Sequence, residues 1–438
     1  MENVLIYGLK NSGKSVIKAL ENNYNLFIYD DNKKVLNNTY QEFFGKVKIL
    51  DNFCCDNIKN FSLIVISPSI SIYKKEIVEA KKMGIKVIGE MELGYLLGIR
   101  PLVSVTGSNG KSTTVKLIEH ILQKSNKKAE AVGNIGKPIT SFCNKEKGNL
   151  INEVSSFQLE SIDKYRSKIG VLLNISPNHL DRHNNFETYK NEKLKLLLHS
   201  KIKIINFDDK NFLFKKNKNT FYFSLTKKVK GAYIEKNYVV INIKKKIRLI
   251  KISEIKLKGQ HNLQNILVAS LVCYLLGIKK KDIKKRLKSF EGLEHRLQKV
   301  ASYKGITFVN DSKSTSIESC LVAVKSFTSN IILLIGGKDK NLDYKSMFKD
   351  MPNNIKRIVI YGQTKQKMEN DLLLSNTRIE YKVCNNLKEA VDYSFLIAEN
   401  KDIVLLSPAT SSFDEFSCFE ERGKYFANRV KEIINEKG

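Results

Sequence analysis

The sequence predicts an α/β protein of three domains. Short apolar runs of strand length alternate with helical patterns along most of the chain, and such alternation predicts parallel sheets covered by helices. The pattern pauses twice and restarts, and 438 residues are too many for one ordinary hydrophobic core. We therefore expect domains over residues 1–97, 98–292 and 293–438.

The first block predicts a doubly wound parallel sheet. Helical patterns at 15–22 and 75–83 separate some of its strands. The pattern then pauses around 98–101, where Pro101 suits a linker between domains. The expected strands are 4–8, 25–30, 46–50, 62–67 and 85–89.

The second and third blocks predict two further α/β sheets. The second block also carries a β-rich insert and closes with a helix at 261–277. Its expected strands are 102–107, 149–155, 169–176 and 202–208, followed in the insert by 219–225, 238–243 and 247–252. Those of the third block are 306–312, 331–337, 357–362, 379–383 and 403–409.

The composition predicts a protein of the reducing cytoplasm that is not held in a membrane. No stretch approaches about 18 consecutive apolar residues, which a membrane-spanning helix needs. The N-terminus lacks the ordered regions of a secretory signal. The seven cysteines are scattered and form no C-x-x-C pair, which argues against a disulfide framework or a zinc cage.

The net charge of +30, from 75 basic and 45 acidic residues, allows two interpretations. One is nucleic-acid binding. The other is a bias toward Lys on every solvated face, because the densest runs, 243–251 and 277–288, alternate with apolar residues as surface strands and helices do. We favour the second interpretation and expect no nucleic-acid partner, although a positive field would help to collect anionic substrates.

Two segments resemble the loop that holds the phosphates of ATP. GLKNSGKS (8–15) fits the pattern G-x-x-x-x-G-K-[ST] in full, whereas the segment from Leu102, LVSVTGSNGKST, has Val105 where the first glycine should be. Each lies between an expected strand and an expected helix, so that backbone N–H groups at a helix N-terminus can face phosphate. The loops themselves do not decide which one binds ATP.

The acidic residue that follows each loop favours the second one. A phosphoryl-transfer site needs a carboxylate near Mg²⁺, usually at the end of a neighbouring strand. Glu153 ends an apolar strand after the second loop, where it could reach a Mg²⁺ held by Ser112. Asp30 follows the first loop at a spacing that suits the ribose-binding acid of a Rossmann unit.

These and further segments resemble the Mur ligases and the folylpolyglutamate synthetases, and the match covers nearly the whole chain. The segments follow the order of the family: TGSNGKST (106–113), GNIG (133–136), EVSSFQLE (153–160), LNISPNHLDRH (173–183), KLKGQHNLQN (256–265), GLEHRL (292–297), NDSKST (310–315), IGGKDK (335–340) and LLSPATSSFDEFSCFEERG (405–423). The resemblance implies a Rossmann-like N-terminal domain for a uridine nucleotide, a central P-loop ATPase-type domain and a Rossmann-like C-terminal domain for an amino acid.

Within the Mur ligase family, the member that adds D-glutamate fits best. The first domain with Asp30 and the tail SPATSSFDEFSCFEERG are similar to that member, and no D-N-P-R stretch points to the ligase of the next step. The resemblance implies that ATP phosphorylates the carboxylate of UDP-MurNAc-L-alanine, that the amine of D-glutamate attacks the acyl phosphate, and that phosphate leaves. It implies ATP and two Mg²⁺ ions, and we expect a monomer.

The resemblance assigns a role to each candidate site residue. ATP is expected at Gly107, Ser108, Asn109, Gly110, Lys111, Ser112, Thr113, Asn262, Asn265, Arg296 and Asp311. Mg²⁺ is expected at Ser112, Glu153, His179 and Lys193, and the catalytic residues are expected to be Lys111, His179 and Lys193. The sugar nucleotide is expected at Asn11, Ser12, Asp30, Ser69 and Asn134, and D-glutamate at Lys313, Thr315, Lys340, Ser412, Phe413 and Phe419.

Lys193 matches the family lysine that reacts with CO₂ to give a carbamate, which turns a cation into an anion that can help to hold the second Mg²⁺. Its neighbours Lys190 and Lys195 are alternatives, because this loop is one residue shorter than in similar enzymes. His183 follows His179 at a spacing that also suits a zinc pair, but no further ligand accompanies the two, and the resemblance gives His183 no role.

Two positions depart from the family, and two other functions compete. Ser69 stands where Gly is often found, and Ser316 where Asn is frequent. A folylpolyglutamate synthetase would explain the shared segments but lacks the uridine-nucleotide domain expected in the first ninety residues. A P-loop NTPase acting on nucleic acid would explain the charge of +30 and the two loops.

Overall fold

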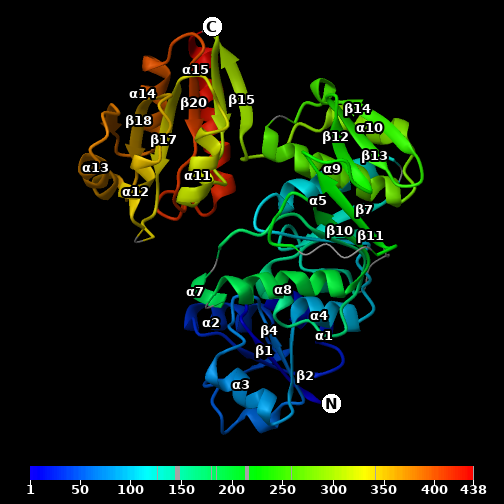
Figure 1. Ribbon diagram of the computed structural model, residues 1–438. Coiled ribbons are helices and arrows are strands. Elements are labelled where there is room, and N and C mark those ends of the chain that lie inside the picture. Colours follow the sequence, from blue (N-terminus) through cyan, green and yellow to red (C-terminus); the bar gives the residue numbers. More distant parts are fainter. Residues whose placement is uncertain are drawn as a thin grey trace. The chain divides into compact units, whose positions relative to one another are not determined.

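The computed structural model describes residues 1–438 except 126, 144–147, 179, 184, 213–216, 258, 341 and 438, together with all side chains in this part but those of 180, 181, 260 and 261. The chain forms two compact units, Met1–Phe290 and Glu291–Gly438 (Figure 1). Unit 1 holds two sheets and unit 2 holds one. The boundaries expected at residues 97 and 292 stay predictions.

The N-terminal sheet of unit 1 is parallel throughout and has the strand order β3-β2-β1-β4-β5. Apolar side chains fill both faces, against α1 and α2 on one side and α3 on the other. The order reverses between β1 and β4, which is where folds of this class bind nucleotides. The elements are β1 (Asn3–Tyr7), α1 (Asn11–Leu20), β2 (Asn25–Tyr29), α2 (Lys33–Glu42), β3 (Val47–Ile49), β4 (Leu63–Ile66), α3 (Lys75–Lys82) and β5 (Lys86–Gly89).

The second sheet of unit 1 has nine strands in the order β14-β13-β12-β11-β10-β9-β6-β8-β7. The expected insert is not a separate piece, because β11 pairs in parallel with β10 and β12 in parallel with β11, after which β13 and β14 continue the sheet in antiparallel pairs. The strands are β6 (Val103–Thr106), β7 (Ala129–Gly133), β8 (Asn149–Glu153), β9 (Ser167–Leu172), β10 (Ser200–Asn206), β11 (Thr220–Ser224), β12 (Gly231–Glu235), β13 (Tyr238–Asn242) and β14 (Lys246–Lys251).

The helices of this second sheet lie next to its central strands and include several of the segments that carry the family resemblance. Helices α5 and α9 pack on each other (Figure 1), and α8 packs on β9 and against α6. The helices are α5 (Lys111–Gln123), α6 (Ser156–Leu159), α7 (Leu180–His183), α8 (Phe186–Leu198), α9 (Gln260–Leu275) and α10 (Lys280–Ser289).

The sheet of unit 2 has the order β15-β16-β20-β17-β18-β19 and is parallel except for β15. Helices α11–α13 cover one face, and α14 and α15 cover the other. The elements are β15 (Gln298–Tyr303), β16 (Ile306–Asn310), α11 (Ile317–Val324), β17 (Ile331–Gly336), α12 (Tyr344–Lys349), β18 (Ile355–Tyr361), α13 (Lys365–Leu374), β19 (Tyr381–Val383), α14 (Leu387–Ile397), β20 (Ile403–Leu406) and α15 (Phe419–Lys437).

The predicted α/β fold class is confirmed, and every expected strand is present. Three strands were not predicted: β7, β12 and β15. β15 is a partly exposed edge strand, which needs few apolar residues; β7, also at a sheet edge, is short and consists mostly of small residues (AEAVG); and β12 begins at a glycine. Among the described residues, no helix is long and apolar enough to cross a bilayer.

Two buried carboxylates of α4 (Glu90–Leu96) connect the two sheets of unit 1. Glu90 accepts hydrogen bonds from the Thr140 N–H and hydroxyl, both at 2.8 Å. Glu92 accepts from three consecutive N–H groups, those of Asp163 (3.0 Å), Lys164 (2.7 Å) and Tyr165 (3.0 Å). Because buried N–H groups need acceptors, the Glu92 carboxylate fixes the N-terminal turn of α4 to the turn before β9.

We predict that Glu92→Ala destabilises the protein. The change leaves buried N–H donors without an acceptor, which costs at least about 1–3 kcal/mol of unfolding free energy. Urea unfolding followed by circular dichroism should show a lower midpoint. Glu187→Ala, at an exposed residue, should change the unfolding free energy by less than about 1 kcal/mol. Equal midpoints for Glu92→Ala and the wild type would contradict this account.

Candidate active site

The loop between β6 and α5 takes a conformation that requires glycine at both ends. Gly107 has φ +154° and Gly110 has φ +84°. A Cβ atom at Gly107 would lie 2.9 Å from the Leu173 Cβ, and one at Gly110 would lie 2.5 Å from the Asn265 Oδ1. The loop leads directly into the N-terminus of α5, so its N–H groups can bind an anion such as a phosphate.

The segment after β9 and helix α8 hold this loop from outside. Asn174 accepts from the Ser108 N–H (2.9 Å, carbonyl) and the Asn109 N–H (2.8 Å, side chain), and its amide donates to the Asn109 carbonyl (3.1 Å). The Ser108 hydroxyl lies 2.9 Å from the Tyr189 hydroxyl of α8. These contacts restrict the conformation of the loop.

Two lysines lie at the carbonyl oxygen of Gly107. The Lys111 Nζ donates to it at 2.8 Å and to the Ser108 carbonyl at 2.9 Å, and the Lys193 Nζ donates to it at 3.0 Å. The side chain of Lys193 lies on α8 and is only 2% exposed. Its burial, with the positive charge of Lys111 adding to it, holds the pKa of Lys193 well below the ordinary value, although Glu153 acts in the opposite direction.

Glu153 ends β8, the strand that pairs with β6, and so lies beside the start of the loop. Its Oε1 accepts from the Asn134 side chain at 2.9 Å. Its Oε2 is buried and has no hydrogen-bond partner in the part of the chain that the structure describes. A buried carboxylate oxygen in this state fits a cation ligand, and the Ser112 hydroxyl at the start of α5 fits a second one.

The described residues do not complete a metal site by themselves. No group of three or more His, Cys, Asp or Glu side chains gathers within the described part of the chain. His179, the expected ligand of the second Mg²⁺, lies outside the described residues. The fit to Mg²⁺ therefore rests on Glu153 and Ser112.

Asn262 and Asn265, both expected at ATP, lie on α9 beside the start of α5. The Asn265 amide donates to the Asn262 Oδ1 at 3.0 Å, and the Asn265 Oδ1 accepts from the Thr114 hydroxyl at 3.1 Å. Both asparagines are buried. The structure thus brings Gly107–Thr113, Glu153, Lys193, Asn262 and Asn265 together in unit 1.

The first loop, GLKNSGKS, uses its lysine and serine for other contacts. Lys14 pairs with Glu42, and the buried Ser15 hydroxyl lies 2.7 Å from the hydroxyl of Thr140, in the short 3₁₀ helix Ile139–Phe142 that follows β7. Asp30 accepts from the Leu9 N–H (2.8 Å) and the Asn32 N–H (2.9 Å), so its carboxylate joins the first loop to the loop that follows β2. The side chains of Lys14 and Ser15 are thus both engaged by other residues of unit 1.

The alternatives to Lys193 have different surroundings. Lys190 and Lys195 are partly exposed and pair with Glu187 (3.3 Å) and Glu192 (2.6 Å), three residues away on the same helix. Such pairs are typical of a solvated helix face. Among these lysines, the burial that lowers a lysine pKa is therefore found at Lys193.

His183, which the sequence left without a role, is fully buried. Its Nε2 lies 2.9 Å from the Ser156 hydroxyl and its Nδ1 3.5 Å from the Glu160 Oε1, and its ring stacks on Phe157. These contacts hold α7 against α6 and do not resemble a metal site.

In unit 2, one buried arginine joins the three loops that carry the residues expected at D-glutamate. The Arg422 guanidinium of α15 donates to the carbonyl groups of Ser312 (3.0 Å), Gly336 (3.4 Å), Thr410 (3.0 Å) and Ser411 (3.3 Å), and to the Ser312 hydroxyl (3.0 Å). Ser312 precedes Lys313 and Thr315, Gly336 precedes Lys340, and Ser411 precedes Ser412 and Phe413.

The remaining expected residues of unit 2 lie on these loops with different exposures. Lys340 donates to the Thr315 carbonyl at 2.7 Å, and Lys313 lies over the Phe419 ring at 5.5 Å. Phe413 is 63% exposed, whereas Ser412 is buried. Ser316, which stands where Asn is frequent, caps α11 by accepting from the Ser319 N–H, as Asn also could.

Asp311 stabilises its own loop. It accepts from the Ser407 hydroxyl (2.8 Å), the Ser314 hydroxyl and the Leu297 N–H (3.1 Å), the last of which follows Arg296. Burial raises the pKa of Asp311 to about 6, although the hydroxyl donors act against it. The carboxylate therefore fixes the backbone next to Arg296, whatever it contributes to binding ATP.

Three residues of this arrangement were missed in the sequence: Glu160, Arg182 and Arg422. Each lies in a segment that carries the family resemblance, but its partners lie far away in the sequence, 22 residues apart for Glu160 and Arg182 and 110 for Arg422 and Ser312. The only local signal for these residues is their type: each is a charged Arg or Glu that has no assigned role but lies within a segment that carries the family resemblance.

Comparison with known proteins identifies the family. Residues 2–89 match the family described as Mur ligase MurD-like, N-terminal domain, residues 105–273 the Mur ligase middle domain, and residues 295–410 the Mur ligase, glutamate ligase domain. The chain is 36% identical to the UDP-N-acetylmuramoylalanine–D-glutamate ligase of Caldanaerobacter subterraneus subsp. tengcongensis, over 98% of both chains, and 34% identical to that of Clostridioides difficile, also over 98% of both.

Solved structures show the same fold. The UDP-N-acetylmuramate–alanine ligase of Thermotoga maritima matches 100% of both chains with a TM-score of 0.60 at 14% identity. The MurF ligase of the same organism, solved with ADP, matches 86% of this chain and 92% of its own with a TM-score of 0.57 at 14% identity. The fold and the phosphate loop define a nucleotide-binding α/β ligase. The chain belongs to the Mur ligase family, as the resemblance of its sequence predicted.

We predict that Lys111→Ala weakens the binding of ATP by at least about tenfold. The change removes a cation at the phosphate loop, and hydrogen bonds to charged groups contribute about 1.5–3 kcal/mol. Calorimetric titration with a non-hydrolysable ATP analogue measures the affinity. Lys14→Ala, the matched control, should leave the affinity unchanged, since Lys14 pairs with Glu42. Equal losses in both variants would mean that the first loop binds ATP.

Proposed function

We propose that this protein is the ATP-dependent ligase that joins D-glutamate to UDP-N-acetylmuramoyl-L-alanine during the synthesis of peptidoglycan precursors. The observation that carries the proposal is the identity of 36% and 34%, over 98% of both chains, to two ligases of this name. The match of residues 2–89 to the MurD-like N-terminal domain supports the same member of the family.

The reaction needs a leaving group, because a carboxylate is a poor acyl donor. A carboxylate oxygen of UDP-MurNAc-L-alanine attacks the γ-phosphorus of ATP, the bond from this phosphorus to the bridging oxygen breaks, and ADP leaves. The amine of D-glutamate then attacks the acyl carbon, loses a proton, and displaces phosphate as the amide forms. Orientation of three substrates in one site can contribute about 7–11 kcal/mol to the lowering of the barrier.

The residues at the phosphate loop carry the first step in this proposal. The N–H groups of Gly107–Thr113 hold the phosphates of ATP, and Lys111 exchanges its loop carbonyl contacts for phosphate oxygens. Asn262 and Asn265 lie beside the loop and, with Arg296 and Asp311 of unit 2, are the proposed contacts to the rest of the nucleotide. Lys111 brings positive charge to the place where two anionic substrates must meet.

Mg²⁺ fits the residues present at Glu153 and Ser112. The unpartnered Glu153 Oε2 supports this assignment, and His179 and Lys193 are the further proposed ligands. When bound, the metal would neutralise phosphate oxygens and so lower the repulsion between ATP and the substrate carboxylate.

The state of Lys193 supports a carbamate at this residue. A lowered pKa leaves the amine neutral at a pH where other lysines are protonated, and only the neutral amine adds CO₂. The new N–C bond forms, a proton passes to water, and the product is an anion. Burial of this anion beside Lys111 would be compensated by that cation and by the metal.

The residues that contact the other two substrates are also proposed, each from its place in the family resemblance. The sugar nucleotide would bind at Asn11, Ser12, Asp30, Ser69 and Asn134, at the carboxyl edge of the N-terminal sheet and near Glu153. D-glutamate would bind at Lys313, Thr315, Lys340, Ser412, Phe413 and Phe419, whose loops Arg422 holds. A monomer and a cytoplasmic location stay expectations.

We predict that purified protein releases phosphate from ATP only when UDP-MurNAc-L-alanine and D-glutamate are both present. The acyl phosphate needs the first substrate, and its turnover needs the amine of the second. A phosphate-release assay over a substrate panel checks this, with L-glutamate plus a folate and with single-stranded DNA as the two alternative arms. Robust turnover with a folate, or ATPase activity stimulated by DNA, would overturn the proposal in favour of the respective alternative.

We also predict a carbamate on Lys193 in the presence of ¹³C-bicarbonate, seen as a carbamate carbonyl resonance by NMR. The resonance should be absent from Lys193→Met. It should persist in Lys190→Met, because Lys190 is partly exposed and paired with Glu187. Activity of Lys193→Met below about 1% of wild type, partly restored by a short carboxylic acid added to the assay, would fit a carbamate as an anionic ligand. A resonance that survives Lys193→Met would contradict the assignment.

A further inference from the structure

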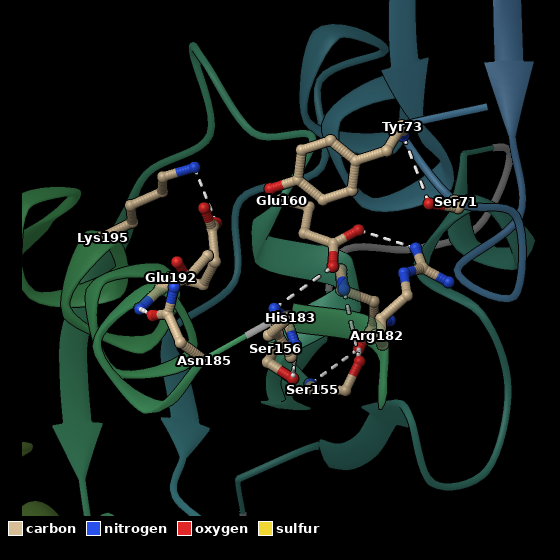
Figure 2. A network of polar contacts seen from close by, with 12 residues as sticks. Ser71, Tyr73, Ser155, Ser156, Glu160, Arg182, His183, Asn185, Glu192 and Lys195 are labelled. Carbon is tan, nitrogen blue, oxygen red and sulfur yellow. Dashed lines mark hydrogen bonds and ion pairs between the residues drawn. The ribbon is translucent and has the colours of Figure 1, made fainter. Parts of the chain in front are cut away.

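Arg182 of α7 contacts two parts of unit 1 that belong to different sheets. Its Nη1 donates to the Ser69 carbonyl at 3.2 Å, and its Nη2 donates to the Ile70 carbonyl at 2.8 Å and to the Glu160 Oε2 at 2.6 Å. Ser69 and Ile70 belong to the loop after β4, here called the 67–70 loop, whereas Glu160 directly follows α6. Figure 2 shows the Glu160 carboxylate between Arg182 and His183.

The pair of Arg182 and Glu160 is enclosed. The Glu160 side chain is fully buried, the Arg182 side chain is 13% exposed, and the guanidinium lies over the Phe157 ring at 4.7 Å. A buried ion pair adds little net stability, because desolvation offsets the attraction. It does restrict geometry, since each charge must keep its partner and a planar guanidinium fixes the direction of every bond it donates.

The 67–70 loop lies where the N-terminal sheet is expected to bind a nucleotide. It follows β4 at the reversal of strand order between β1 and β4. The Ser67 hydroxyl donates to the Gly8 carbonyl at the start of the first loop. A small cavity separates the 67–70 loop from α6 and is lined on its two sides by Ser67, Pro68, Ile70, Phe157 and Gln158.

The other end of the contact lies near the ATP loop. Helix α6 begins three residues after Glu153, and its N-terminus is fixed by a capping box between Ser155 and Gln158. Arg182 therefore connects the nucleotide edge of one sheet to the segment that carries Glu153 on the other. Arg182 thus adds a contact between the two sheets at the nucleotide edge, in addition to those of Glu90 and Glu92 in α4.

We propose that Arg182 is a positioning residue for the sugar nucleotide. It fixes the 67–70 loop to α6 and α7, so that a substrate held at the N-terminal sheet extends toward the ATP loop at one fixed distance. The inference rests on the proposed function. The contact at position 69 is to the backbone carbonyl, so it does not depend on Ser69 standing where glycine is frequent in the family.

The test is Arg182→Lys in the full-length protein. Lysine keeps the positive charge beside Glu160 but cannot donate to both carbonyls and the carboxylate from one plane. We expect the KM for UDP-MurNAc-L-alanine to rise about tenfold, while the KM values for ATP and D-glutamate change by less than about twofold. Calorimetric titration with UDP-MurNAc-L-alanine should show the same loss of affinity.

The matched control is Arg166→Lys. Arg166 also donates to two backbone carbonyls, those of Asp163 (3.0 Å) and Tyr165 (2.7 Å), but both lie in its own turn. This variant should keep all three KM values. If Arg182→Lys does not fold, the double variant Arg182→Met/Glu160→Gln leaves no buried charge unpaired and should show the raised KM.

The outcomes separate the inference from the function on which it rests. A merely structural role of Arg182 would lower the melting temperature and kcat while the KM and affinity for UDP-MurNAc-L-alanine stay unchanged, and this result would overturn the inference. A wild-type protein that neither binds UDP-MurNAc-L-alanine nor releases phosphate with D-glutamate would instead overturn the proposed function, and the inference with it.

Discussion

The centre of unit 1 depends on one constraint: the backbone of the 107–110 loop has no room for side chains at either end. Leu173 leaves no room for a side chain at Gly107, and Asn265 leaves none at Gly110. The neighbours that close this space come from the end of β9 and from α9, so both elements must reach the loop for it to keep its shape. The shape of this loop depends on tertiary contacts as well as on its own sequence. Its sequence has Val105 where the usual pattern has the first glycine.

Unfavourable features gather around the same loop. Lys193 is buried next to another lysine, and a Glu153 oxygen is buried with no donor within the described residues. Each would destabilise an ordinary core, because a buried ionisable group loses its hydration. Their concentration at one place is typical of an active site, where ligands supply the missing partners. The buried carboxylate of Glu92, by contrast, accepts three backbone N–H groups.

The sequence predicted the fold class and all strands except β7, β12 and β15, because buried parallel strands are short apolar runs that can be recognised without knowledge of their neighbours. It did not predict that the insert continues the central sheet, because strand pairing joins residues whose separation leaves no local pattern. The same limit applies to the site. The loop, Glu153 and Lys193 could be named from motifs, whereas the burial of Lys193 and the contacts of Arg182 exist only after folding.

Arg422 has a consequence for how the amino-acid site can vary. Four of its five acceptors are backbone carbonyls, and the fifth is the Ser312 hydroxyl. The three loops of unit 2 are thus held in place without regard to the side chains that they display. If unit 2 binds the amino acid as proposed, substitutions at Lys313, Lys340 or Phe413 would change the side chains on these loops without removing any of the hydrogen bonds by which Arg422 joins them. Substrate preference and the folding of unit 2 would then depend on separate residues.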